Sequence, residues 1–430
     1  MNLTRKFSLL SMPKTAIQGS GLVILLAFVH TISDAITNML SALLPTIQIR
    51  YGLAETSLAF LVATLSFSAL VTQPLFGAVA DRIGHRRIAG LGVIFNAILF
   101  SLIGIVPNVF LLFGLILIGG LGSAALHPAM ASMARLAGGK KGELAVGLFS
   151  AGGTIGIALG PIVIMLLVAN RGLSFTPWLM IPGILLGTFM LFATPEEIQP
   201  ARGEVDKRFD FGLIAGPVGL LALTGILSNV AFVTFTSAMP LWLVHEHDLP
   251  RTSTLIGWTL SLFSLAAAFG GIAGGMLSNR LGARRLIVSS LLLALLPLYS
   301  IFLLQPGSLS YFVMVGMAGA LVNMGMPMLI VSAQDLAPKA AATAAGMLMG
   351  FSAGMAGLVY VGIGWLQESI GLAPAMATGY LALILGAVLA AIVIKSQSVP
   401  EEAPVESLSC LCSPCIDQNI AAFPQRIDQY

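Results

Sequence analysis

The chain has 430 residues, of which 57% are hydrophobic and only 9% are charged, and its mean hydropathy is +0.96. A soluble domain carries roughly 25% charged residues because its surface faces water, so this composition excludes an ordinary soluble globular protein. The formal net charge of +3, with no basic patch interleaved with aromatic residues, argues against nucleic-acid binding.

Long apolar stretches recur along the whole chain and predict membrane-spanning helices, each of which needs about 20 residues to cross the hydrocarbon core. The stretches of the first half lie near residues 19–45, 53–80, 88–106, 109–136, 144–169 and 175–194. Those of the second half lie near 212–244, 253–277, 286–304, 309–334, 342–366 and 373–395. The sequence therefore predicts an all-α polytopic membrane protein with twelve transmembrane helices.

The segments between and around these stretches set the predicted domain boundaries. Residues 1–18 form an N-terminal segment, and residues 195–211 contain the densest charge cluster, which marks a linker. The linker separates two six-helix bundles at 19–194 and 212–395, and a polar tail follows at 396–430.

The basic residues predict the orientation of the chain in the membrane. Eighteen of the 21 lysines and arginines fall on the side that holds both termini, and only Arg50, Arg171 and Arg251 fall on the other side. Cytoplasmic loops of membrane proteins carry such an excess of positive charge. We therefore expect a multi-pass protein of a bacterial inner membrane with both termini and the linker in the cytoplasm.

The two halves of the chain repeat one another. The loop segments 77–87 and 275–285 align at an offset of 198 residues. The matching pairs are Gly77 and Gly275, Arg82 and Arg280, Gly84 and Gly282, Arg86 and Arg284, and Arg87 and Arg285. Internal duplication is a mark of secondary transporters whose substrate site lies between the repeats, so the bundles are expected to be pseudo-symmetric.

The first span carries three polar residues, His30, Asp34 and Asn38, spaced so that all three share one helical face. Asp34 is the one acid that the predicted spans place near the middle of the membrane, where an ionised carboxylate is costly unless it faces water or takes up a proton. We predict that Asp34 and its neighbour His30 couple transport to protons and that Asn38 faces the substrate cavity. The alternative is a structural polar contact between helices.

Three further polar residues inside the spans are candidates for the substrate cavity. His127 precedes Pro128 in the fourth span, and its ring either contacts substrate or caps a backbone group freed by the proline. Asn229 and Asn323 in the second half either line the cavity or form hydrogen bonds between helices.

The pattern Gly-x-x-x-Asp-Arg-x-Gly-x-Arg-Arg at 77–87 resembles the loop signature of the major facilitator superfamily. Within that family, HTISDAITNML (30–40) and GSAALHPAMASMARLAGG (122–139) are similar to the fosmidomycin-resistance type of efflux protein. The chain departs from that type at Ala129, because an acid often follows the His-Pro pair there. The resemblance implies two six-helix bundles around a central cavity and transport by alternating access.

The resemblance also implies roles for two groups of residues. In the gating motif, Asp81 would bind a helix N-terminus near the eleventh span or pair with Arg135, closing the cytoplasmic gate; the alternative is a basic loop that only sets orientation. The gating residues are Gly77, Asp81, Arg82, Gly84, Arg86, Arg87 and Arg135. The fifth span matches an antiporter-type motif at Gly147, Gly156, Gly160 and Pro161. The alternative interpretation of these residues is ordinary packing of small residues between helices.

Together these features predict a proton-coupled secondary transporter that exports a small apolar or amphipathic compound, such as a drug or metabolite, in exchange for protons. The alternative is a proton-coupled uptake symporter for a nutrient or organic metabolite. We expect a monomer whose partners are the small-molecule substrate, protons and the lipid bilayer, with no enzymatic activity and no cofactor besides the proton gradient. We also expect no metal site, since Cys410, Cys412 and Cys415 in the tail lack a fourth ligand.

Overall fold

The structure, a computed structural model, describes residues 17–139, 142–194, 215–337 and 341–394. Within these ranges there is no strand, and twelve helical segments are long and apolar enough to cross a membrane. The predicted all-α fold with twelve spans is therefore confirmed. The linker and the polar tail with its three cysteines lie outside the described residues, and the domain boundaries there stay predictions.

The first half of the chain supplies six spans. Their helices are α1 (Gly19–Tyr51), α2 (Glu55–Ser66), the π-helical segment η2 (Phe67–Val71), α3 (Gln73–Ile83), α4 (His85–Ser101), α5 (Val109–Gly138), α6 (Gly142–Arg171) and α7 (Met180–Ala193). Short 3-10 segments at Leu102–Gly104 and Leu173–Leu179 extend α4 and precede α7.

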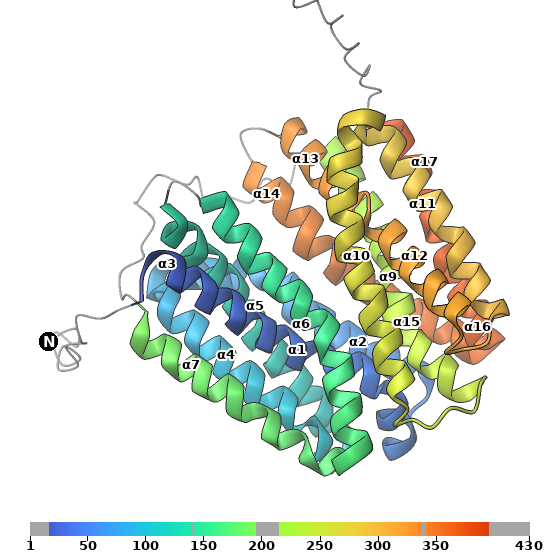
Figure 1. The fold of residues 1–430 in the computed structure, drawn as a ribbon, viewed down its shortest axis with the longest axis horizontal. Coiled ribbons are helices and arrows are strands. Elements are labelled where there is room, and N and C mark those ends of the chain that lie inside the picture. The colour runs from blue at the N-terminus through green and yellow to red at the C-terminus, as the bar shows by residue number, and fades with distance from the viewer. Residues whose placement is uncertain (1–16, 140–141, 195–214, 338–340, 395–430) are drawn as a thin grey trace, which may run out of the picture. The chain divides into compact units, whose positions relative to one another are not determined.

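The second half supplies the other six spans. Their helices are α9 (Pro217–His245), α10 (Thr254–Leu281), α11 (Ala283–Ser300) with a 3-10 segment at Ile301–Leu303, α12 (Leu309–Asn323), α13 (Met326–Leu336), α14 (Ala341–Gly346), the π-helical segment η8 (Met347–Phe351), α15 (Ser352–Ile370), α16 (Leu372–Tyr380) and α17 (Ala382–Val393). In Figure 1 the blue-to-green helices of the first half and the yellow-to-red helices of the second half form two groups.

Successive spans run in alternate directions, so the turns gather at two ends of the bundles. We call the end that holds the turns at Gly84 and Gly282 the basic end, and the end that holds the turns after α1 and α9 the opposite end. Gly84 has φ +112° and Gly282 has φ +78°, and each glycine ends one helix and precedes the next. Side chains with a Cβ rarely adopt positive φ, so the repeated glycines make the same turn in both halves.

The first span is longer than its sequence pattern predicted. We expected it to end near Pro45, but α1 continues through this proline to Tyr51 and stops at Gly52, which has φ 62°. A proline interrupts only one backbone hydrogen bond, and membrane helices tolerate this where neighbouring helices cover the site. Pro45 is buried, so the proline does not mark the end of the span.

Two spans contain a π-helical segment near their middle. The segment η2 separates α2 from α3, and η8 separates α14 from α15. These two segments contact each other across the halves. A π-helical turn breaks the regular hydrogen-bond ladder of an α-helix and is a common site of bending.

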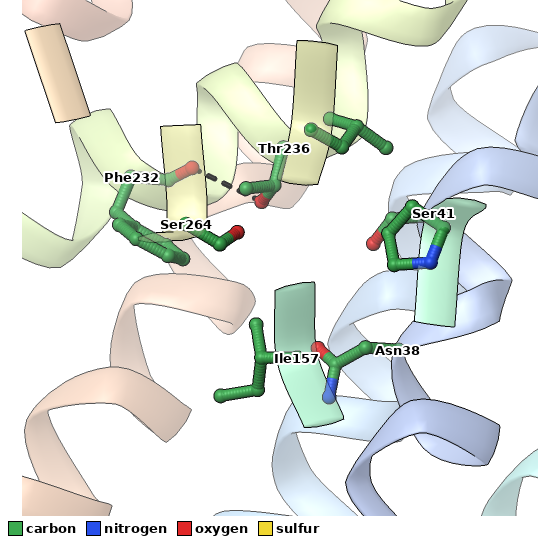
Figure 2. A pocket seen from close by; sticks show the side chains of 8 residues that line it. Asn38, Ser41, Ile157, Phe232, Thr236 and Ser264 are labelled. Atoms are coloured by element: carbon green, nitrogen blue, oxygen red, sulfur yellow. Dashed lines mark hydrogen bonds between the residues drawn. The ribbon is translucent and has the colours of Figure 1, made fainter. Parts of the chain in front are cut away.

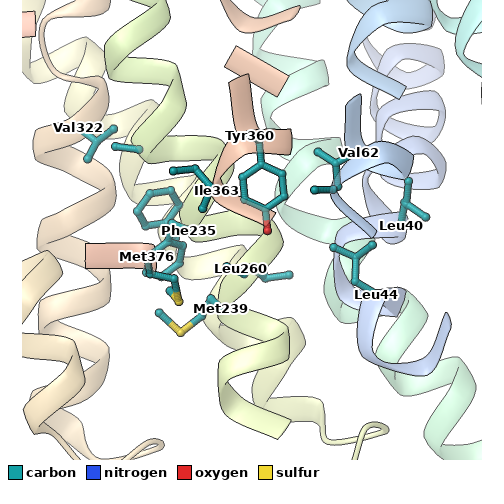
Figure 3. Close-up of a cluster of buried hydrophobic side chains, with 14 of the residues drawn as sticks. Leu40, Leu44, Val62, Phe235, Met239, Leu260, Val322, Tyr360, Ile363 and Met376 are labelled. Atoms are coloured by element: carbon teal, nitrogen blue, oxygen red, sulfur yellow. The ribbon is translucent and has the colours of Figure 1, made fainter. Parts of the chain in front are cut away.

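The most extensive contacts between the halves are those of α2 with α15 and of α6 with α10, and α1 also packs on α9. One cluster of buried apolar side chains continues from the first half into the second. Figure 3 shows this continuity, with Leu44 and Val62 on one side and Tyr360, Phe235 and Met239 on the other. The described spans therefore belong to one compact unit.

Two groups of hydrogen bonds between the halves lie at the opposite end. The carboxylate of Glu368, near the end of α15, accepts the backbone N–H of Thr56 in the first turn of α2 at 2.7 Å. The Nε2 atom of His245, at the end of α9, lies 2.8 Å from Oε1 of Gln48 in α1, and the Gln48 amide donates to Glu55 at 3.1 Å. An acid placed at the N-terminus of a helix satisfies a free N–H group, so Glu368 caps a helix of the other half.

Candidate transport site

The predicted site in the first span gains a third member from the fourth span. Nε2 of His127, in α5, lies 3.1 Å from Oδ1 of Asp34, and Nε2 of His30 lies 3.2 Å from Oδ2 of the same carboxylate. The side chains of Asp34 and His30 are 10% and 8% exposed. A buried carboxylate thus lies between two imidazole rings, whose centroids are 4.8 Å apart.

Backbone carbonyl groups determine which ring nitrogen of each histidine carries hydrogen. Nδ1 of His30 lies 2.8 Å from the carbonyl oxygen of Phe149, and Nδ1 of His127 lies 2.6 Å from that of Ser123. A carbonyl oxygen only accepts hydrogen bonds, so both Nδ1 atoms must donate. A neutral ring would then turn an unprotonated Nε2 toward Asp34. The contact of His127 with the carboxylate is therefore a hydrogen bond only when an additional proton is present.

Helix α6 covers this site because it lacks side chains where it crosses α1. A Cβ atom built on Gly153 would lie 2.6 Å from Nε2 of His30 and 2.9 Å from Oδ2 of Asp34. A Cβ on Gly152, Gly156 or Gly160 would overlap the backbone of α1. The hydroxyl of Thr31 also donates to the carbonyl of Gly152 at 2.9 Å. Small residues let helix backbones approach closely in membranes, and here they place α6 directly on the titratable side chains.

Phe149, Gly152 and Gly153 were not among the site residues predicted from the sequence. Phe149 contributes its carbonyl and stacks its ring on His30 with centroids 4.1 Å apart. The sequence signal that could have predicted this contact is the pair Gly152 and Gly153 on the same helix as Gly156 and Gly160. The pair widens the helix face that carries no side chains, which allows close packing on another helix.

A small cavity lies beside the site, between the two halves. It is lined by Asn38, Ser41, Ile157, Pro161, Phe232, Thr236, Leu260 and Ser264. Figure 2 shows Asn38, Ser41 and Ile157 from the first half facing Phe232, Thr236 and Ser264 from the second. The empty space between the lining atoms, including the part that is open to solvent, is about 280 Å³. The lining combines hydroxyl, amide and apolar groups and contains no charged side chain.

The structure separates the four residues that we predicted for the substrate cavity. Asn38 lines the cavity, while its amide donates to the Asp34 carbonyl at 2.9 Å. His127 joins the carboxylate site instead. Asn229 donates to the Gly225 carbonyl in its own helix, and Asn323 donates to the Ala267 carbonyl of α10. The last two are engaged with backbone groups and are not among the lining residues.

The gating motif lies at the basic end. Gly77 faces Pro128, the residue after His127, and a Cβ there would lie 3.5 Å from the Pro128 Cβ. Arg86 donates to the Thr194 carbonyl at 3.0 Å, while Arg82, Arg87 and Arg135 are exposed. The Asp81 side chain is outside what the structure describes, so its predicted contact with a helix N-terminus or with Arg135 stays a prediction.

The antiporter-type motif of the fifth span has three members at helix contacts. Gly156 and Gly160 pack on α1, and the backbone of Pro161 lies against Gly257 of α10, where a Cβ would be 2.7 Å from the Pro161 carbonyl oxygen. Gly147 faces open space, with no atom within 4 Å of a Cβ built on it. The hydroxyl of Ser261, in α10, donates to the carbonyl of Ala158. The same helix thus contacts the carboxylate site and the other half of the protein.

The residues of this site are also of the types that bind metal ions. One ligand atom from each of His30, Asp34 and His127 lies within 4.8 Å of the others. Histidine nitrogens and carboxylate oxygens are common ligands of Zn²⁺. The same three side chains can therefore serve either a proton or a divalent cation.

The fold and the site together define a membrane transporter built from two repeated bundles, with a buried carboxylate next to a cavity between them. The sequence matches the Major Facilitator Superfamily over residues 26–361, and the chain belongs to this family. Its members and its fold are those of transporters.

The curated relatives cover most of the chain and include efflux proteins. The uncharacterized MFS-type transporter YfnC of Bacillus subtilis (strain 168) is 25% identical over 88% of this chain and 94% of its own length. The fosmidomycin resistance protein of Escherichia coli (strain K12) is 23% identical over 79% of this chain and 84% of its own length. The multidrug resistance protein MdtG of Citrobacter koseri is 27% identical over 56% of this chain and 61% of its own length.

Solved structures show the same fold. The nucleoside transporter NupG superimposes with a TM-score of 0.70 at 14% identity and covers 86% of this chain and 98% of its own. A bacterial homologue of the human lysosomal transporter Spinster, in an inward-facing and occupied conformation, has a TM-score of 0.69 at 17% identity over 86% of this chain and 96% of its own.

Proposed function

We propose that this protein is a proton-coupled antiporter that exports a small uncharged or amphipathic compound across a bacterial inner membrane. The observation that carries the proposal is Asp34, a buried carboxylate between two histidines in the interior of the spans. Ionisable residues within membrane helices are costly to maintain and commonly form proton relays. No other described acid lies at this depth, since Glu55, Glu246 and Glu368 are at helix ends of the opposite end and Asp335 is at the end of α13.

The chemistry of the cavity supports the substrate class. Its hydroxyl and amide groups can form hydrogen bonds with a polar group, while Phe232, Ile157 and Leu260 offer apolar contact. A strongly anionic or cationic substrate would find no counter-charge among the lining residues. An amphipathic compound without net charge fits this lining best.

The arrangement of contacts supports alternating access with the opposite end closed. The bonds of Glu368 with Thr56 and of His245 with Gln48 join the halves there. The distribution of basic residues supports an orientation with this end outside and with the basic end and both termini in the cytoplasm. In this arrangement the cavity exchanges with the cytoplasm, and the bonds at the outer end must break before the substrate leaves the cell.

We favour export over uptake because of the names of two relatives. One, similar over most of the chain, is named for resistance to fosmidomycin, and the other, similar over about half of it, is named for resistance to multiple drugs. The packing of α6 on α1 through the antiporter-type glycines agrees with this direction. The alternative, an uptake symporter, would use the same carboxylate, so a direct measurement of direction is required.

The first experiment identifies a compound and then measures proton exchange. Cells with and without the gene are compared for susceptibility across a chemically varied panel, and a compound to which the gene gives resistance is added to energised inside-out vesicles. Antiport predicts that protons leave the acidic vesicle interior when this compound is added to the cytoplasmic face. The Asp34→Asn protein, which keeps size and hydrogen bonding but cannot take up a proton, should show no such exchange at a matched protein level.

Three outcomes would decide against parts of the proposal. Proton movement that persists in Asp34→Asn vesicles would refute Asp34 as the coupling site. A compound that accumulates in cells together with protons would establish uptake. Exchange that stops when EDTA is added and resumes with Zn²⁺ would show that the His30, Asp34 and His127 site works as a metal site.

A further inference from the structure

The two histidines beside Asp34 differ in burial and in bonding. The side chain of His127 is 20% exposed and that of His30 only 8%. His127 Nε2 forms a hydrogen bond with Asp34, whereas His30 Nε2 is within 3.2 Å of the carboxylate but lies outside hydrogen-bond geometry. His127 is thus the less buried ring and the one in hydrogen-bond contact with the carboxylate.

The bond between His127 and Asp34 depends on a proton. Because Nδ1 of His127 donates to the Ser123 carbonyl, a ring with no second proton turns a nitrogen lone pair toward a carboxylate oxygen 3.1 Å away. That arrangement buries a net charge of −1 against a lone pair and is unfavourable. One proton between Nε2 and Oδ1 brings the net charge of the pair to zero and creates a charge-assisted hydrogen bond. The contact between α1 and α5 is therefore made with the proton and weakened without it.

The bonds of His30 do not depend on this proton. Nδ1 of His30 donates to the Phe149 carbonyl, and the neighbouring hydroxyl of Thr31 donates to the Gly152 carbonyl, so two bonds join α1 to α6. The His30 ring also stacks on the Phe149 ring. These contacts keep Asp34 against α6 whether or not the carboxylate shares a proton with α5.

We infer that His127 is the proton-exchanging partner of Asp34 and that His30 is a positioning residue that holds the carboxylate on α6. This inference rests on the proposed proton coupling and refines it. Among the described residues, the charged groups that act on Asp34 are these two histidines, and from α6 Gly153 and Gly156 lie against its carboxyl group and its Cβ. Loss of the proton from the pair frees α5 from α1, while α1 and α6 move as one.

Purified protein in lipid nanodiscs, with ¹⁵N-labelled histidine rings, tests the assignment without a substrate. The chain has five histidines, so single substitutions identify each ring signal. The His127 ring should lose its second proton in one pH step, and the infrared carboxylate bands of Asp34 should shift in the same step because the hydrogen bond from Nε2 is lost. His127→Gln, whose amide can still donate to Asp34 but cannot titrate, should abolish this step. His30→Asn, whose amide can still donate to Phe149, should leave its midpoint unchanged.

Transport measurements on the same variants separate a positioning role from proton exchange. His127→Gln should lose proton exchange to the level of Asp34→Asn, whereas His30→Ala should slow transport at every pH without moving the pH profile. If His127→Gln does not reach the membrane, His127→Asn, which can keep the bond to Ser123, takes its place.

A wild-type titration step in His127→Gln, or a midpoint displaced in His30→Asn, would overturn the inference. Loss of exchange in Asp34→Asn with normal exchange in His127→Gln would overturn this inference alone. Persistent exchange in Asp34→Asn would instead overturn the proposed function.

Discussion

At the residue scale, the carboxylate of Asp34 is enclosed by atoms that leave no space for an added methyl group on α6. At Gly153 a Cβ would lie 2.4 Å from Cε1 and 2.6 Å from Nε2 of His30, and 2.9 Å from Asp34 Oδ2. Real Cβ atoms do not come this close, so a substitution here must displace the histidine, the carboxylate or the helix.

We predict that Gly153→Ala impairs proton-coupled transport while the protein still inserts into the membrane. Forcing an extra methyl group into a packed site costs about 1–3 kcal/mol, and here the strain falls on the titratable side chains. Gly147→Ala is the matched control, because it lies on the same helix and its Cβ would meet no atom. Proton exchange in vesicles compares the two. Equal exchange by both variants would show that α6 does not confine the site.

The sequence indicated part of this site. His30 and Asp34 are four residues apart on one helix, so helical periodicity alone predicts that they are neighbours. The distance from Asp34 to His127 is 93 positions in sequence, and no periodicity relates residues on different helices. The contribution of Phe149 is a backbone carbonyl, which every residue possesses, so the side chain type could not reveal it.

At the scale of elements, α6 contacts both the site and the other half of the protein. One stretch of its surface packs on α1 through Gly152, Gly156 and Gly160, and the next stretch packs on α10 at Pro161. The glycine spacing predicted close packing but not its partners. Because a helix is rigid along its length, a displacement of α1 can reach α10 through this helix.

We predict that Gly257→Ala shifts the protein away from the state in which the opposite end is closed. A Cβ there would lie 2.7 Å from the Pro161 carbonyl oxygen and 3.0 Å from Ile162 Cα, which are backbone atoms that cannot rotate away. The resulting cost, about 1–3 kcal/mol, applies only while α6 and α10 touch. Distances between spin labels placed across the opposite end measure the populations of the states in which that end is closed or open. Gly362→Ala, where a Cβ meets no atom, is the control, and identical distance distributions would contradict the prediction.

At the scale of the whole molecule, the number of spans and the duplication were predictable because lipid imposes them. Each crossing needs a long apolar helix, and the interruptions between such helices are visible in sequence. The mid-span π-helical segments and the continuation of α1 past Pro45 were not predictable in this way. Both depend on how neighbouring helices cover irregular backbone, which is a property of the packed bundle.

We predict that Glu368→Ala opens the opposite end more readily. Removing the cap of α2 destabilises the closed state and leaves the open state unaffected, because the two groups are then apart. A membrane-impermeant maleimide should therefore label Ser264→Cys faster from outside, in a protein whose tail cysteines are replaced. Glu246→Ala is the matched control, since Glu246 accepts the N–H of Ala373 within one half. Equal labelling in both variants would contradict this role.

We also predict that both termini are cytoplasmic, as the basic residues indicate. A reporter enzyme that works only in the cytoplasm should be active when fused after Lys395. Activity of a reporter that works only outside the cytoplasm, fused at the same position, would contradict the proposed orientation.

The position of Asp34 along α1 has a consequence for the driving force of transport. Asp34 is preceded by 15 residues of this 33-residue helix and followed by 17, so at 1.5 Å per residue it lies about 22 Å from one end and about 26 Å from the other. A proton that reaches the carboxylate from either surface then crosses close to half of the membrane voltage. At 100 mV this half is worth roughly 1.2 kcal/mol per charge. Electrical potential would therefore contribute to loading the site on one side and unloading it on the other, even where the pH is equal on both sides.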